Sequence, residues 1–167
     1  MRLTFTLLLL IIINGAIAQD GIHSIGLRAG GGSGITYKYV EDGAYGFEGI
    51  IGYRENGFQL TGLYEMYRPM KTDRIRNFYF FSGFGAHTGY IREMEKFYGQ
   101  SNGQCVMFEH KKTHVIGGID GVVGFEYHFY SIPMVLTLDY KPYAEFFGEK
   151  FFRIDLWNFG LSFRYTF

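Results

Sequence analysis

Large apolar or aromatic residues alternate with small or polar ones along most of the chain. The clearest case is the last eleven residues, 157–167, in which every second residue from Trp157 to Phe167 is apolar and the residues between are Asn, Gly, Ser, Arg and Thr. A period of two is that of a β-strand with one apolar and one polar face. About 9–11 residues is also the length at which a tilted strand crosses a bilayer. The pattern therefore predicts a strand long enough to span a membrane.

The same alternation divides the rest of the chain into further strands, which turn signals separate. Eight strands are predicted, over residues 24–30, 35–40, 44–53, 58–67, 78–90, 115–129, 134–141 and 157–167. Residues 24–40 could instead form one long strand with a glycine bulge. An even number of strands is typical of bacterial single-chain barrels and favours the division into two. We therefore predict an all-β, eight-stranded, antiparallel up-and-down transmembrane barrel.

Connection lengths fit this arrangement. Residues 91–113 form the longest predicted loop, and Asn56-Gly57 is a pair favoured in tight hairpins. Outer-membrane barrels have short periplasmic turns and longer external loops. With the C-terminus in the periplasm, the external connections are residues 31–34, 54–57, 91–113 and 147–153, and the periplasmic ones are 41–43, 68–77 and 130–133.

Residues 1–18 have the pattern of an export signal. A basic residue is followed by an apolar run over residues 5–13 and by a small-x-small cleavage site at residues 16–18. The run is shorter than the roughly 20 residues of a transmembrane helix, and no other long apolar run follows. We expect export through the Sec pathway, cleavage before Gln19, no transmembrane helix in the mature chain, and one barrel domain over residues 19–167.

Composition excludes some classes of protein. Aromatic residues make up 20% of the chain and glycines number 24, which is unusual for a soluble domain. The formal net charge of zero gives no basic excess for binding nucleic acid. Cys105 is the single cysteine, so no internal disulfide is predicted.

Alternation alone does not say which face of the barrel points outward, since a soluble lipocalin-like barrel would have its apolar face inside. The polar face is rich in Gly, Ser and Thr, which suit a narrow interior. Tyr and Trp lie near strand ends on the apolar face, where the aromatic girdles of membrane barrels are found. These residues are Tyr39, Tyr45, Tyr53, Tyr90, Tyr127 and Trp157. We therefore predict that the apolar face contacts lipid.

The polar face then brings charged residues inside. They are Arg28, Lys38, Glu48, Glu65, Asp120, Glu126, Asp139, Lys141 and Arg164. The interior of an eight-stranded barrel is just wide enough for side chains to fill it, and buried charges must be paired. Four positive and five negative residues predict an interior packed with salt bridges. A charged ion pathway is the alternative.

The mature chain as a whole resembles the small eight-stranded outer-membrane barrels of Gram-negative bacteria, a family loosely called porin-like. The resemblance rests on the export signal, the strand count, the alternation and the terminal Phe167. In that family the last residue is typically Phe and directs assembly, so the resemblance implies an assembly signal at Tyr165 and Phe167. It also implies outer-membrane lipid and the barrel-assembly machinery as partners, and a monomer.

The sequence gives only weak evidence for catalytic residues. Some small barrels of this membrane are enzymes that act on lipid A, and one kind has a His and a Ser two residues apart on an outward strand face. Here His128 and Ser131 are three residues apart. His87 is followed on its own strand face by Gly89, which has no nucleophilic side chain. His23 and Ser24 are adjacent and so face opposite sides. Polar filling of the interior, or a place at a strand end, explains each histidine better.

No metal or cofactor site is predicted either. His110 and His114 have a spacing that binds zinc on a helix, but they lie in a predicted loop without a Cys or Asp cluster. The sequence thus predicts a non-enzymatic outer-membrane barrel with a structural or surface-interaction role through its external loops. Alternatives are a lipid A-modifying enzyme and a narrow small-solute channel. The sequence does not indicate a ligand for the loops.

Overall fold

The computed structural model describes residues 21–70, 77–101, 104–147 and 152–167, so the predicted export signal lies outside the described residues. Within these ranges the regular elements are β-strands. They are β1 (Gly21–Gly30), β2 (Ser33–Glu41), β3 (Tyr45–Arg54), β4 (Gly57–Pro69), β5 (Phe78–Ser101), β6 (Gln104–His128), β7 (Met134–Tyr140), β8 (Tyr143–Phe147), β9 (Arg153–Asp155) and β10 (Phe159–Thr166). In the described part of the chain, no helix is long and apolar enough to cross a membrane.

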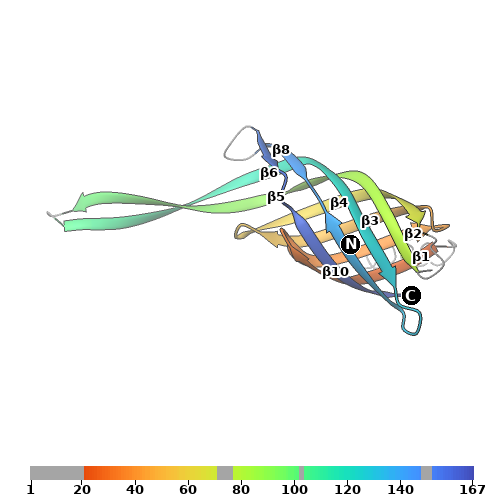
Figure 1. Cartoon of the computed structure of the whole chain (residues 1–167). Coiled ribbons are helices and arrows are strands. Elements are labelled where there is room, and N and C mark those ends of the chain that lie inside the picture. Colours follow the sequence, from red (N-terminus) through yellow and green to blue (C-terminus); the bar gives the residue numbers. More distant parts are fainter. Residues whose placement is uncertain (1–20, 71–76, 102–103, 148–151) are drawn as a thin grey trace, which may run out of the picture.

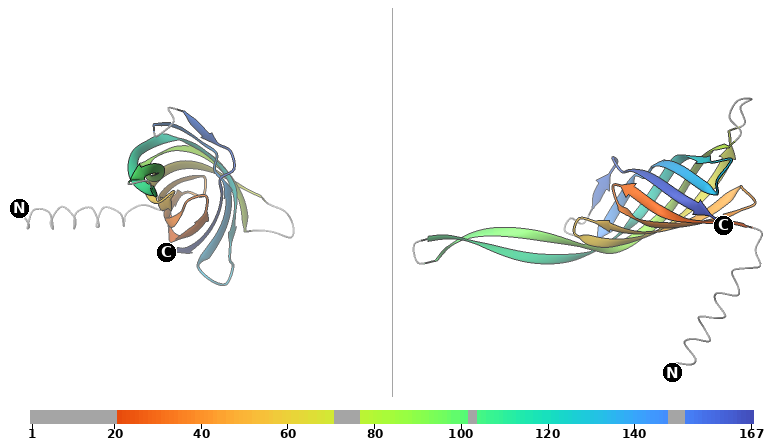
Figure 2. Two further views of the ribbon diagram at one scale, coloured as in Figure 1. Left: turned by 90° about the vertical axis from the view of Figure 1, so that its left-hand side faces the viewer. Right: turned by 90° about the horizontal axis from the view of Figure 1, so that it is seen from below.

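The strands form one antiparallel sheet that closes on itself (Figures 1 and 2). Each strand from β1 to β7 pairs with the next, and β10 lies between β7 and β1. β8 follows β7 after a break at Pro142, and β9 precedes β10 in the same manner. Counting each broken strand once gives eight wall strands. The predicted eight-stranded up-and-down barrel is therefore confirmed.

The two ends of the barrel differ. β1 begins beside the end of β10, and the backbone N–H of Phe167 donates to the carbonyl of His23 at 2.9 Å. We call this the inner end. The opposite end, where β5 turns into β6, is the outer end. Residues 24–40 are two paired strands with a turn at Gly31-Gly32, as the even strand count predicted.

The β3–β4 turn differs from the sequence prediction. Its two central residues are Glu55 and Asn56, with φ of 48° and 57°, and Gly57 already pairs with Arg54 in the ladder. Positive φ at both central residues matches the twist of a tight hairpin, and Asn tolerates it well. Gly57 serves another purpose, because a Cβ there would lie 1.8 Å from the carbonyl oxygen of Tyr90.

The prediction of a loop over residues 91–113 is wrong. β5 and β6 have 24 and 25 residues and stay paired from Phe78↔Tyr127 to Ser101↔Gln104. The part that extends beyond the barrel, residues 93–101 paired with residues 104–112, is called the ribbon here (Figure 1). Outside the barrel wall a strand does not separate a packed interior from an apolar outer surface. The in–out alternation that marks the other strands is therefore missing from this sequence.

Candidate functional site

The barrel wall has the opposite polarity to that of a soluble protein. Leu27, Phe84 and Ile119 point outward and are 69%, 62% and 57% exposed. Along β3 the burial alternates at every residue, with Glu48 inside and Phe47 outside. Large apolar side chains thus cover the outer surface, while charged side chains are buried.

An inner ionic cluster occupies the half of the barrel near the termini. It consists of Lys38, Glu48, Glu65, Glu126 and Arg164, which come from five different strands and are all buried. The Lys38 ammonium lies 2.7 Å from Glu65, 3.1 Å from Glu48 and 3.4 Å from Glu126. The Arg164 guanidinium contacts Glu126 at 2.7 Å and Glu48 at 3.1 Å. The cluster therefore joins opposite walls of the barrel.

Neutral side chains add hydrogen bonds to this cluster. The Tyr67 hydroxyl accepts from Lys38 at 2.9 Å and donates to Glu65 at 3.0 Å. The Thr36 hydroxyl donates to Glu48. Arg164 donates to the hydroxyl of Thr137. Glu65 Oε1 and Arg164 Nε have no hydrogen-bond partner among the described residues, but each charged group of the cluster is paired with an opposite charge, which makes the cluster a structural unit.

An outer ionic cluster lies toward the ribbon and consists of Arg54, His87, Asp120, Lys141 and Glu145. His87 is bracketed by Asp120, 2.7 Å from Nδ1, and by Glu145, 3.2 Å from Nε2. Lys141 donates to Asp120 at 2.8 Å, and Arg54 donates to Glu145 at 2.7 Å. Each carboxylate thus contacts the histidine and one further cation.

The structure buries all nine charged residues assigned to the interior by the alternation, and each of them has an ion pair. The two of the nine that lie outside both clusters are Arg28 and Asp139, which form a bidentate pair with N–O distances of 3.0 and 2.7 Å. The sequence analysis missed Arg54 and Glu145 as interior residues. Glu145 carries a usable signal, because it continues the phase of Asp139 and Lys141 beyond Pro142.

The interior also contains an apolar part. Ile50, Leu63, Tyr67, Phe81 and Val122 are buried and pack together inside the barrel. Lys38 Nζ lies 4.5 Å from the centre of the Phe81 ring. Phe81 is 1% exposed and is an apolar residue on a face that is otherwise mostly polar. Its ring fills space beside the inner ionic cluster.

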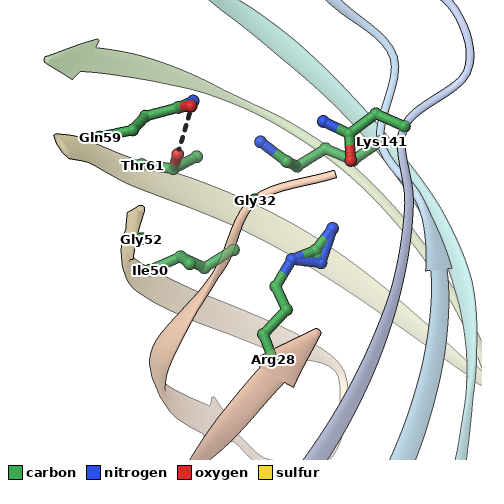
Figure 3. Close-up of a pocket in the computed structure, with 8 residues that line it drawn as sticks. Arg28, Gly32, Ile50, Gly52, Gln59, Thr61 and Lys141 are labelled. Carbon is green, nitrogen blue, oxygen red and sulfur yellow. Dashed lines mark hydrogen bonds between the residues drawn. The ribbon is translucent and has the colours of Figure 1, made fainter. Parts of the chain in front are cut away.

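Two cavities that described residues line inside the barrel are small. Figure 3 shows the one toward the outer end, where Arg28 and Lys141 point toward the side of the barrel that carries Gln59 and Thr61. Its volume is about 10 Å³, which is room for about one water molecule. A cavity of about 80 Å³ lies at the inner end, beside His128. Both are well below the roughly 300–1,000 Å³ of typical ligand pockets.

The histidines have structural partners. His128 Nε2 lies 2.7 Å from Glu126, and His23 Nδ1 lies 2.7 Å from the Tyr37 hydroxyl. His110 and His114 lie on strand β6, where the sequence had predicted a loop. Among the residues whose positions the structure describes, no group of three His, Cys, Asp or Glu side chains is arranged to hold a metal ion.

Comparison with known proteins gives little further information. No protein-family model matches the chain, and no curated protein matches its sequence. Among solved structures, the chain is similar to the N-terminal β-barrel domain of Pseudomonas aeruginosa OprF, with 13% sequence identity and a TM-score of 0.49, over 89% of this chain and 98% of that one.

Proposed function

We propose that this chain is a non-enzymatic outer-membrane β-barrel protein with a structural or surface-interaction role. The observation that carries the proposal is the polarity of the wall, with apolar side chains outside and paired charges inside. Water would disfavour so much exposed apolar surface, whereas the hydrocarbon of a bilayer would favour it. Outer-membrane lipid is therefore the proposed environment of the barrel.

Aromatic residues support this placement. Tyr45 lies at the inner start of β3 and is 48% exposed, and Tyr53 lies near its outer end and is 62% exposed. Trp157 is 83% exposed. Tyr and Trp favour the boundary between hydrocarbon and water, where a ring and a polar group are both accommodated.

The ribbon is the element proposed for surface interaction. It extends from the end opposite the termini (Figures 1 and 2). With the C-terminus on the periplasmic side, as proposed, the ribbon points out of the cell. The chemistry of a ligand for the ribbon stays open.

The same proposal includes export through the Sec pathway with cleavage before Gln19, a monomeric barrel, and insertion by the barrel-assembly machinery through Tyr165 and Phe167. A lipid A-modifying enzyme is less well supported, because His87 is buried with a carboxylate at each ring nitrogen, which leaves neither nitrogen free to act on a substrate. A solute channel is less well supported because ion pairs join opposite walls.

Fractionation of cells that express the full chain tests the proposal. We expect the protein in the outer-membrane fraction, and we expect unheated samples to migrate differently from boiled ones on a gel, because a closed barrel keeps its hydrogen-bonded ladder until it is boiled. A known periplasmic protein from the same cells provides the control for leakage between fractions. Recovery of the chain with that control, together with identical mobility before and after boiling, would contradict the membrane assignment.

A further inference from the structure

The ribbon leaves the barrel between two supports. On its β5 side, the backbone N–H of Arg92 donates to the carbonyl of Glu55 in the β3–β4 turn, with an N–O distance of 3.3 Å. On its β6 side, Gly117 pairs with Phe147 of β8. Beyond these contacts, the described residues provide no third strand that pairs with the ribbon. Its direction is therefore determined where it joins the barrel.

These two supports are also connected to each other. Arg153 on β9 forms a bidentate ion pair with the Glu55 carboxylate, with N–O distances of 3.1 and 2.8 Å. β9 pairs with β8, so Arg153 ties the β8–β9 pair to the β3–β4 turn. A second link runs from Arg54 to Glu145 on β8 at 2.7 Å. The β3–β4 turn, the bases of β5 and β6, β8 and β9 thus form a closed ring, which we call the collar.

Glu55 occupies a special place in the collar. Its carbonyl contacts the base of the ribbon, and its carboxylate contacts Arg153. The turn that carries it is well defined, because Glu55 and Asn56 both have positive φ and the Tyr53 hydroxyl donates to the Asn56 side chain at 2.9 Å. Glu55 therefore connects β9 directly to the base of the ribbon, in parallel with the link from Arg54 to Glu145, and its carboxylate also lies 3.5 Å from Arg54 Nε.

β9 depends on this ion pair more than the other strands do. It has three residues and pairs with β8. The last pair between β1 and β10 is Gly30↔Gly160, so the ladder with β1 does not extend as far as β9. In the strand order, β1 and β2 also separate β10 from β3. Within the described residues, β9 therefore has no strand on its second edge, and Arg153 provides its contact with the turn across from it.

We propose that the ion pair between Glu55 and Arg153 holds the collar closed and thereby fixes the direction in which the ribbon leaves the barrel. The Arg153 and Glu55 side chains are 39% and 37% exposed, and Glu55 also contacts Arg54 of the outer ionic cluster at 3.5 Å, so Arg153 is the partner whose change affects the buried clusters least. A two-stranded ribbon gains little stability on its own, which makes its base the point of control. The inference concerns the ribbon alone and does not require a known partner.

Cys105 is the single cysteine of the chain and pairs with Gln100 near the tip of the ribbon, so it provides the position for a first nitroxide label. A second nitroxide label is placed at Ser33→Cys, an exposed position at the outer start of β2. Double electron–electron resonance on the detergent-solubilised full chain then gives the distribution of distances between the two labels, one on the ribbon and one on the barrel. The variants are Arg153→Gln, the charge exchange Glu55→Arg with Arg153→Glu, and the control Arg68→Gln, which removes an exposed arginine at the end of β4.

We expect Arg153→Gln to widen the distance distribution about twofold, since the base of the ribbon loses one of its ties. Arg68→Gln should leave the distribution as it is in the unchanged chain. The charge exchange should give a narrower distribution than Arg153→Gln. The shift in gel mobility on heating, measured for each variant, shows that the barrel itself has formed. An unchanged distribution in Arg153→Gln would overturn the proposal, and so would a charge exchange that gives no narrowing.

Discussion

At the scale of single residues, Arg164 makes the clearest prediction. Its guanidinium is 1% exposed and contacts Glu48 and Glu126, so Arg164→Leu leaves two buried acids with one cation fewer. Removing one partner of a buried pair costs on the order of 3–5 kcal/mol. We expect a loss of about this size in the free energy of unfolding, measured by urea titration in detergent or lipid. Arg68→Leu at an exposed site should change it by less than about 0.5 kcal/mol. Equal stability of the two variants would show that the inner ionic cluster contributes little.

The alternation of inward and outward positions along each strand explains why most of the charged interior residues could be predicted. A strand with one face in lipid has no place for an unpaired charge on that face, so every second residue of β2, β3 and β7 is informative. Arg54 was not predicted as an interior residue, because the Asn56-Gly57 pair suggested a turn over residues 54–57, whereas Arg54 is still part of the strand in the structure. Individual ion pairs could not be predicted, since Lys38 meets Glu126 across the barrel and only the closed ring determines which walls face each other.

At the scale of elements, the closing strand β10 can be tested separately from the rest. Phe167 is 64% exposed and lies on the outer face with Tyr165, while Thr166 between them is turned inward. The proposed assembly signal therefore predicts that Phe167→Ser reduces the amount of inserted barrel severalfold, as measured in outer-membrane fractions. Thr166→Ser, next to it on the other face, should insert like the unchanged chain. Equal insertion of both variants would contradict an assembly role for the last residue.

The elements also show where sequence patterns stop being informative. β1 to β4 follow the predicted ranges closely, because an apolar outer surface on one side and the packed interior on the other impose a period of two. The ribbon lacks both environments, and its strand character comes from pairing with itself over residues 93–101 and 104–112. The breaks at Pro142 and before Phe159 divide two wall strands without opening the barrel, which the sequence did not reveal.

At the scale of the whole molecule, the packing of the interior separates a structural barrel from a channel. The inner cluster ties β2 to β6 through Lys38 and Glu126, and the outer cluster ties β3 to β8 through Arg54 and Glu145. Between them, Arg28 and Asp139 form a third link, from β1 to β7. Beside these links, the cavity toward the outer end has room for about one water molecule.

Planar-bilayer recordings of the purified full chain test this arrangement directly. We expect no steady conductance, because a permeating ion would have to displace ion pairs that are buried in a low-dielectric interior. A large bacterial porin reconstituted in the same way provides the positive control, since its channel is filled with water. The Arg164→Leu variant distinguishes the two models further. A structural interior predicts lower stability without a defined channel, whereas a pore predicts that the unchanged chain conducts and that the variant has an altered conductance at nearly the same stability. That second pair of results would mean that the barrel is a channel and that its ion pairs line a water-filled path.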